Sequence, residues 1–234
     1  MCGIISTISI KPDRKDTADI EAMLASLSKR GPDDKATVRI DSTTTAHLRC
    51  TFGQTRLSIL DIEGGKQPMR DNTLPLTVVF NGEIYNYKEL RTELEKAGHR
   101  FSTKSDTEAI LKAYAEWGKD APKHLDGMFA FALWDERTDS LFMARDRFGK
   151  KPLYYAWEGP EKTSTFMLAS EIKALFASGK IKGRIDPQAL DTYLSLMYIP
   201  ADRSVYSNIH QLPPCSRSHV QPRFRPHRVA VLDA

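Results

Sequence analysis

Apolar residues occur in two kinds of pattern along this chain, short runs typical of strands and helically spaced positions typical of helices. Residues 4–10 form the first strand-like run, because the run is short and rich in β-branched side chains. Residues 16–29 predict a helix, because their apolar positions recur at helical spacing, namely Ile20, Met23, Leu24 and Leu27. Gly31-Pro32 then ends the predicted helix.

The remaining chain predicts further strands and helices. The strands are expected at residues 37–40, 43–49, 51–60, 76–80, 128–134, 141–145, 152–157 and 166–169. The helices are expected at residues 87–97, 105–117, 170–178 and 186–197. Short turns join the late strands, which indicates antiparallel pairing. Helices covering two stacked antiparallel sheets fit this order, so we predict an α+β fold, a four-layer αββα sandwich.

The composition is that of an ordinary globular protein, and it narrows the classes of function. Of the 234 residues, 41% are hydrophobic and 27% are charged, and no run approaches the ~20 apolar residues of a membrane helix. No basic segment followed by an apolar core indicates a signal peptide, so we expect a cytoplasmic protein without a membrane partner. The tail from residue 215 carries +3 of the net charge of +4, so the rest shows no excess of basic residues for nucleic acid.

The three cysteines, Cys2, Cys50 and Cys215, are far apart in the sequence and odd in number. They show neither a disulfide framework nor the paired spacing of a metal site, so we expect no metal. Cys2 is the candidate for chemistry because it directly follows Met1. Removal of Met1 would place a thiol and a free α-amine on one residue, where the amine can accept the thiol proton. The ordinary alternative is a small residue that follows the start by chance.

Four other motifs each have an ordinary structural explanation. Arg30-Gly31-Pro32-Asp33 is a helix stop, and Arg56 in a β-prone run is a solvated strand residue or a ligand clamp. Asn81-Gly82 after a strand is a hairpin turn, or a pair of donors for an oxyanion. Asp106 lies in a capping-box pattern that begins at Ser105, where an acid stabilises the first turn of a helix. The loop at residues 64–75 lacks the Lys-Ser/Thr ending of a phosphate-binding loop, so it has no predicted nucleotide role.

These motifs occur together in the order that one family shows. They are Cys2-Gly3-Ile4, Arg30-Gly31-Pro32-Asp33, Arg56-Leu57-Ser58-Ile59, Asn81-Gly82-Glu83-Ile84-Tyr85-Asn86, Ser105-Asp106-Thr107-Glu108, Gly127-Met128-Phe129-Ala130-Phe131 and Arg145-Asp146-Arg147-Phe148-Gly149. Over roughly residues 2–214 the chain resembles the glutamine-hydrolysing amidotransferase domain of asparagine synthetases, a class II N-terminal-nucleophile hydrolase.

The resemblance implies a role for each matching position. Cys2, freed of Met1, attacks the side-chain amide of L-glutamine, and the Asn81 side chain and Gly82 N–H hold the oxyanion. Arg56 grips the substrate α-carboxylate, and Asp106, assisted by Glu83, binds the α-ammonium group. The pocket wall is implied to be the backbone of Leu57, Ser58, Ile59 and Leu60.

The sequence departs from the family after the predicted hydrolase fold. Asparagine synthetases activate aspartate with ATP through a Ser-Gly-Gly-x-Asp-Ser loop, and this sequence contains no such stretch. We therefore expect an amidotransferase domain at residues 2–184, the start of a truncated synthetase domain at 185–214, and an aberrant, disordered tail at 215–234. ATP and magnesium would belong to the missing domain, so no cofactor and no asparagine synthesis are expected of this chain.

Three interpretations stay open at this point. The chain is a glutaminase half that supplies ammonia for asparagine biosynthesis, a non-catalytic truncated fragment, or a subunit that docks on a separate synthetase chain. A homodimer is a further possible assembly. Measured glutamate release distinguishes the first interpretation from the second.

Overall fold

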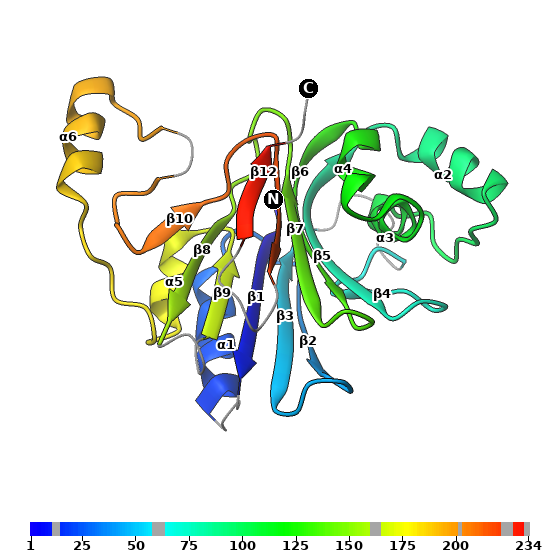
Figure 1. Ribbon diagram of the computed structural model, residues 1–234, viewed down its shortest axis with the longest axis horizontal. Coiled ribbons are helices and arrows are strands. Elements are labelled where there is room, and N and C mark those ends of the chain that lie inside the picture. The colour runs from blue at the N-terminus through cyan, green and yellow to red at the C-terminus, as the bar shows by residue number, and fades with distance from the viewer. Residues whose placement is uncertain (11–14, 58–63, 160–164, 201–202, 221–226, 232–234) are drawn as a thin grey trace.

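Two six-stranded antiparallel sheets form the centre of the computed structural model, which describes residues 1–10, 15–57, 64–159, 165–200, 203–220 and 227–231 (Figure 1). The first sheet has the order β10-β8-β9-β1-β3-β2 and the second has the order β12-β11-β7-β6-β5-β4. The strands of the first sheet are β1 (Gly3–Ile10), β2 (Asp34–Asp41), β3 (Leu48–Arg56), β8 (Tyr154–Glu158), β9 (Thr165–Ala169) and β10 (Ile209–Gln211). The strands of the second sheet are β4 (Met69–Arg70), β5 (Leu76–Ile84), β6 (Gly127–Asp135), β7 (Ser140–Arg145), β11 (Ser216–Val220) and β12 (His227–Val231).

Helices cover the outer face of each sheet, so the fold is the predicted four-layer αββα sandwich (Figure 1). The first sheet is covered by α1 (Lys15–Ser26) and α5 (Ile172–Ala177). The second sheet is covered by α2 (Tyr87–Lys96), α3 (Asp106–Trp117), the 3₁₀ turn η1 (Gly118–Asp120) and α4 (Ala121–His124). The remaining helix, α6 (Pro187–Leu196), stands apart from both sheets at one end of the molecule.

The hydrophobic core is divided into three clusters by these four layers. Ile4 and Ile8 of β1 join the cluster between the sheets, whereas Ile5 packs against α1 and α5. On β5, Val79 faces the other sheet, and Val78 belongs to the cluster beneath α2, α3 and α4. Both faces of these strands are buried, which is why the sequence shows continuous apolar runs rather than alternation.

Two local predictions are corrected by the strand pairing. The runs predicted separately at 43–49 and 51–60 contribute to a single strand, β3, which ends at Arg56. Asn81-Gly82 makes no hairpin turn, because β5 continues through it and pairs Asn81 with Ala130 and Gly82 with Phe129. Pairing with β6 along the whole of β5 therefore overrides the local turn preference of the dipeptide.

The C-terminal part of the described chain also differs from the expected disordered tail. Strand β10 pairs with β8, and β11 pairs with β7 from Ser216 to Val220, so the chain extends both sheets beyond residue 184. In β11 the side chains of Ser216, Ser218 and Val220 are buried in alternation. Serine is small enough to fit such positions, and its polarity hid the strand pattern. The division into domains at residue 184 stays a prediction.

Helix α6 and Met197, which caps its C-terminus, expose a group of apolar side chains. The exposed fractions are 39% for Leu190, 42% for Tyr193, 69% for Leu194 and 74% for Met197. Within the residues that the structure describes, no helix is long and apolar enough to cross a membrane.

Candidate functional site

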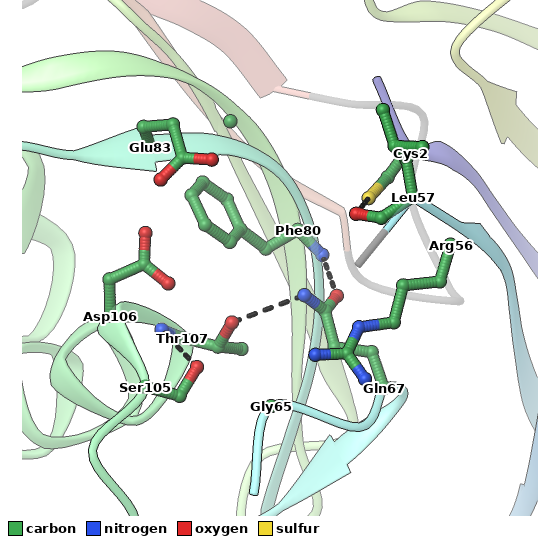
Figure 2. A pocket seen from close by; sticks show the side chains of 11 residues that line it. Cys2, Arg56, Leu57, Gly65, Gln67, Phe80, Glu83, Ser105, Asp106 and Thr107 are labelled. Atoms are coloured by element: carbon green, nitrogen blue, oxygen red, sulfur yellow. Dashed lines mark hydrogen bonds between the residues drawn. The ribbon is translucent and has the colours of Figure 1, made fainter. Parts of the chain in front are cut away.

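Cys2 lies directly before β1, at the edge of the cavity drawn in Figure 2. Its thiol donates a weak hydrogen bond to the Leu57 carbonyl over 3.8 Å. Burial raises the pKa of this thiol, while the Leu57 contact and the positive charges of the N-terminus and Arg56 act in the opposite direction. With Met1 in place, the thiol is therefore a weak nucleophile at neutral pH.

Arg30 fixes the backbone of Cys2. Its Nε donates to the Cys2 carbonyl at 2.9 Å, and its guanidinium forms an ion pair with Glu171 at 2.9 Å. Gly31 lies so close to β3 that a Cβ there would be 2.4 Å from the Thr55 carbonyl. Any larger residue would push the turn away from the strand, so Arg30-Gly31 is more than a helix stop.

Arg56 ends β3 and is 6% exposed, so it is not a solvated strand residue. The Asp33 N–H donates to its carbonyl at 3.0 Å and holds the end of the strand. Figure 2 shows the Arg56 guanidinium on the same side of the cavity as Cys2, with Gln67 beside it.

The Gly82 N–H points away from the neighbouring strand and toward the cavity. Gly82 pairs with Phe129, whose own N–H and carbonyl bond to Asp146 on the opposite side. Gly82 and Phe129 therefore form a pair without mutual hydrogen bonds, and the amide of Gly82 faces the open side of β5. A Cβ at Gly82 would be 2.1 Å from the Met128 carbonyl, so only glycine permits this approach.

Asn81 supplies a second donor. The residue is 1% exposed, and within the described part of the chain its side-chain Nδ2 is buried without a hydrogen-bond partner. A buried amide nitrogen without a partner costs free energy, and native structures keep few of them. Such a donor is suited to a negative charge that appears only when a ligand reacts.

Two carboxylates lie across the cavity from Cys2 (Figure 2). Asp106 begins α3, and its Oδ2 accepts the Ile84 N–H at 3.0 Å. Burial raises its pKa, and the hydrogen bond from Ile84 acts against that rise. Burial and then the charge of Asp106 raise the pKa of Glu83, while Lys151 lowers it.

The capping box predicted at the start of α3 is only half formed. Ser105 caps the helix by accepting the Thr107 N–H at 3.2 Å. Glu108 does not reach back to Ser105, because its carboxylate accepts the backbone N–H groups of Ser102 and Thr103.

One open cavity brings most of the predicted residues together. Its lining includes Cys2, Arg56, Leu57, Gly82, Glu83 and Asp106. Asn81 is next to the lining on β5, and the predicted residues Ser58, Ile59 and Leu60 lie outside the described part of the chain. The lining residues that sequence reasoning missed are Gly65, Gln67, Phe80, Ser105 and Thr107.

The cavity is chemically asymmetric. A guanidinium and a thiol lie on one side, and two carboxylates lie on the other. An amino acid zwitterion needs one cationic and one anionic anchor, so this arrangement suits a free amino acid with its side chain directed at the thiol. The described residues hold no group of three or more His, Cys, Asp or Glu side chains that could bind a metal ion.

Comparison with known proteins agrees with this geometry. The family model of a glutamine amidotransferase domain matches residues 1–225. The chain is 43% identical over 201 residues to asparagine synthetase [glutamine-hydrolyzing] 3 of Bacillus subtilis, covering 84% of this chain and 31% of that protein. It is 37% identical to putative asparagine synthetase [glutamine-hydrolyzing] 2 of Methanocaldococcus jannaschii, covering 91% of this chain and 42% of that protein. The chain thus spans less than half the length of these relatives.

Solved structures support the fold. Glutamine phosphoribosylpyrophosphate amidotransferase from Bacillus subtilis, complexed with ADP and GMP, aligns with a TM-score of 0.66 at 20% identity, over 97% of this chain and 49% of that one. A structure described as the allosteric regulatory enzyme of purine biosynthesis aligns with a TM-score of 0.68 at 19% identity, with the same coverage. Fold, cavity and sequence therefore agree, and the chain belongs to the family of glutamine amidotransferase domains.

Proposed function

We propose that this chain hydrolyses the side-chain amide of L-glutamine to glutamate and ammonia, with Cys2 as the nucleophile. The observation that carries the proposal is the cavity that gathers the Cys2 thiol, the Gly82 amide and the opposite charges of Arg56 and Asp106. The family match and the glutamine-hydrolysing relatives support the choice of substrate.

The two ends of the cavity orient the substrate. Arg56 binds the α-carboxylate through its planar guanidinium, and Asp106 with Glu83 binds the α-ammonium group. Burial raises the pKa of both carboxyls, and an arriving ammonium favours their ionised forms. The Leu57 carbonyl lies beside the thiol and forms part of the cavity wall.

The reaction proceeds in two halves. The Cys2 Sγ bonds to the amide carbon, its proton passes to the α-amine of Cys2, and the negative charge on the oxygen is held by Asn81 and Gly82. Collapse of this intermediate breaks the C–N bond, and the proton held by the α-amine leaves with the nitrogen as ammonia. Water then attacks the thioester, which releases glutamate and restores the thiol.

This mechanism requires that Met1 be removed, because only then is the α-amine part of Cys2. Met1 is 56% exposed, which leaves it open to an aminopeptidase. Intact mass spectrometry of active protein should show the loss of one methionine. Full activity in protein that retains Met1 would exclude the α-amine as the base.

The use of the ammonia is a second part of the proposal. We place the chain as the ammonia-supplying part of asparagine synthesis in the cytoplasm, with a synthetase unit as partner, because its relatives carry that name and are much longer. Cys2, Cys50 and Cys215 form no disulfide, which is typical of proteins in a reducing compartment.

Glutamate release from L-glutamine tests the proposal directly. Wild-type protein should release glutamate and ammonia in equal amounts, and Cys2→Ala should release neither. Cys215→Ala is the matched control, because it removes another partly buried thiol that does not line the cavity. Equal activity of wild type and Cys2→Ala would overturn the proposal, and an inactive, folded wild type without Met1 would favour a non-catalytic fragment.

A further inference from the structure

Gln67 lies in the loop before β4 and lines the cavity, although no sequence motif assigned it a role. It is 8% exposed. Its Oε1 accepts the Phe80 N–H at 2.6 Å, and its Nε2 donates to the Thr107 hydroxyl at 3.1 Å (Figure 2). One side chain thus connects β5 to the first turn of α3.

The orientation of this amide is determined by its partners. The Phe80 N–H can only donate, so the oxygen of the Gln67 amide must face it. The NH₂ group is then directed at the Thr107 oxygen, which accepts. Both contacts are buried, where losing a partner is expensive.

Hydrogen bonds to α3 and to Gln67 lie on either side of the Gly82 amide along β5. The N–H groups of Phe80, Gly82 and Ile84 lie on the same open side of β5, because alternate residues of a strand share a direction. Gln67 accepts the first of these N–H groups and Asp106 accepts the third. Because Thr107 follows Asp106 on α3, the hydrogen bonds close a ring from β5 through Gln67 and α3 back to β5.

We propose that Gln67 is a positioning residue, which sets the distance between the oxyanion donor on β5 and the ammonium anchor on α3. The inference rests on the proposed glutamine hydrolysis. Gln67 itself touches neither reacting atom in this role. It holds Phe80, and therefore the neighbouring Asn81-Gly82, in register with Asp106.

Loss of the Gln67 side chain should make the positions of both β5 near Gly82 and the start of α3 less well defined. The Gly82 N–H would lose its alignment with the developing oxyanion, which lowers kcat. The start of α3 would move relative to Arg56, which raises KM for glutamine. Displacement of catalytic groups by about 1 Å can cost about 100-fold in rate, so we expect kcat/KM to fall about 10- to 100-fold.

Gln67→Ala is compared with Asn72→Ala in the experiment. Asn72 is an exposed residue of the following segment, and its side chain donates to Ser102 before α3 at 3.0 Å. The control therefore also removes a side-chain hydrogen bond between the region of β4 and the start of α3. This hydrogen bond does not belong to the ring formed by β5, Gln67 and α3. Kinetics are measured with glutamine, folding with circular dichroism, and thiol access through the rate of Cys2 alkylation by iodoacetamide.

Gln67→Ala should hydrolyse glutamine more slowly, whereas its rate of Cys2 alkylation should stay within about twofold of wild type. The reason is that alkylation needs no oxyanion donor. Asn72→Ala should match wild type in every measurement. Unchanged kcat and KM in Gln67→Ala would overturn the proposal, as would an equal fall in hydrolysis and alkylation, which indicates collapse of the whole cavity.

Thr107→Val and Thr107→Ser provide a second pair in case Gln67→Ala does not fold. Valine keeps the shape of threonine and removes the hydroxyl that Gln67 contacts, whereas serine keeps the hydroxyl. Activity should fall at least about fivefold in the valine variant and return with serine. Equal activity of Thr107→Val and Thr107→Ser would contradict a role for the hydrogen bond between Gln67 and Thr107. If wild type released no glutamate in the same assay, the proposed function would fail rather than the role of Gln67.

Discussion

The buried amide nitrogen of Asn81 leads to a prediction in which activity and stability move in opposite directions. Its buried Nδ2 has no partner among the described residues, and such a donor costs about 1–3 kcal/mol of folding stability. Leucine branches at the same carbon and carries no polar atom. Asn81→Leu should therefore remove this cost, although its slightly larger volume offsets part of the gain.

The expected magnitudes follow from these terms. Unfolding free energy should range from unchanged to about 2 kcal/mol higher, and each kcal/mol corresponds to about 2–4 °C in Tm for a chain of this size. The reaction loses one oxyanion donor, so kcat should fall about 100- to 1000-fold, which is about 2.7–4 kcal/mol of transition-state stabilisation.

Val79→Ala is the opposite control on the same strand. Val79 faces the same inter-sheet side as Asn81 and is fully buried. Its truncation removes two methyl groups from the core and should cost about 2 kcal/mol of stability, with kcat of the folded protein unchanged. Glutamate release at saturating glutamine gives kcat, and thermal melting followed by circular dichroism gives Tm.

Two results would refute the reasoning. An Asn81→Leu variant that keeps kcat within about threefold of wild type would show that Asn81 is no oxyanion donor. A Tm lower by more than about 4 °C would show that its amide has a stabilising partner in the folded protein.

Three further predictions concern the anchors, the nucleophile and the core. Arg56→Lys and Asp106→Asn should each raise KM for glutamine by roughly 10- to 150-fold, because each loses a charge-assisted contact worth about 1.5–3 kcal/mol; unchanged KM would contradict the assigned anchors. In protein that retains Met1, the rate of Cys2 alkylation should still increase as the pH rises above the ordinary pKa of a thiol, because burial raises the pKa of this thiol. A rate that reaches its plateau below that pH would contradict the raised pKa. Lys112→Met should cost about 3–5 kcal/mol at pH 7 in urea unfolding, because its ammonium pairs with Asp71 at 2.6 Å in the buried core. Burial acts to raise the pKa of Asp71, but hydrogen bonds led by the one from Lys112 lower it, so the stability that the ion pair contributes is present above the ordinary aspartate pKa and is lost as the pH falls below that value. The difference in unfolding free energy between wild type and Lys112→Met should therefore shrink at acidic pH. A difference that does not change with pH would exclude the ion pair as its source.

Local sequence patterns were enough to predict most helices, and the short motifs predicted part of the cavity lining. Helix α1 follows from apolar residues at helical spacing, and Ser105 is found as the cap of α3 because capping depends on near neighbours. The order of short motifs, from Cys2 to Gly149, was enough to indicate the family.

Tertiary structure decided the features that depend on distant partners. Asn81-Gly82 has the local signature of a turn, yet pairing along β6 keeps it extended and directs the Gly82 amide at the cavity. Ser216–Val220 lacks an apolar strand pattern, yet β7 offers it an open edge.

Gln67 shows the same dependence within the site. Its role rests on Phe80 and Thr107, which are 13 and 40 residues away in the sequence. The identity of a residue fixes which groups it can donate or accept, and only the fold brings the partners within hydrogen-bonding distance. The sequence therefore determined the chemistry available to this protein, and packing of the two sheets and α3 determined where that chemistry is aimed.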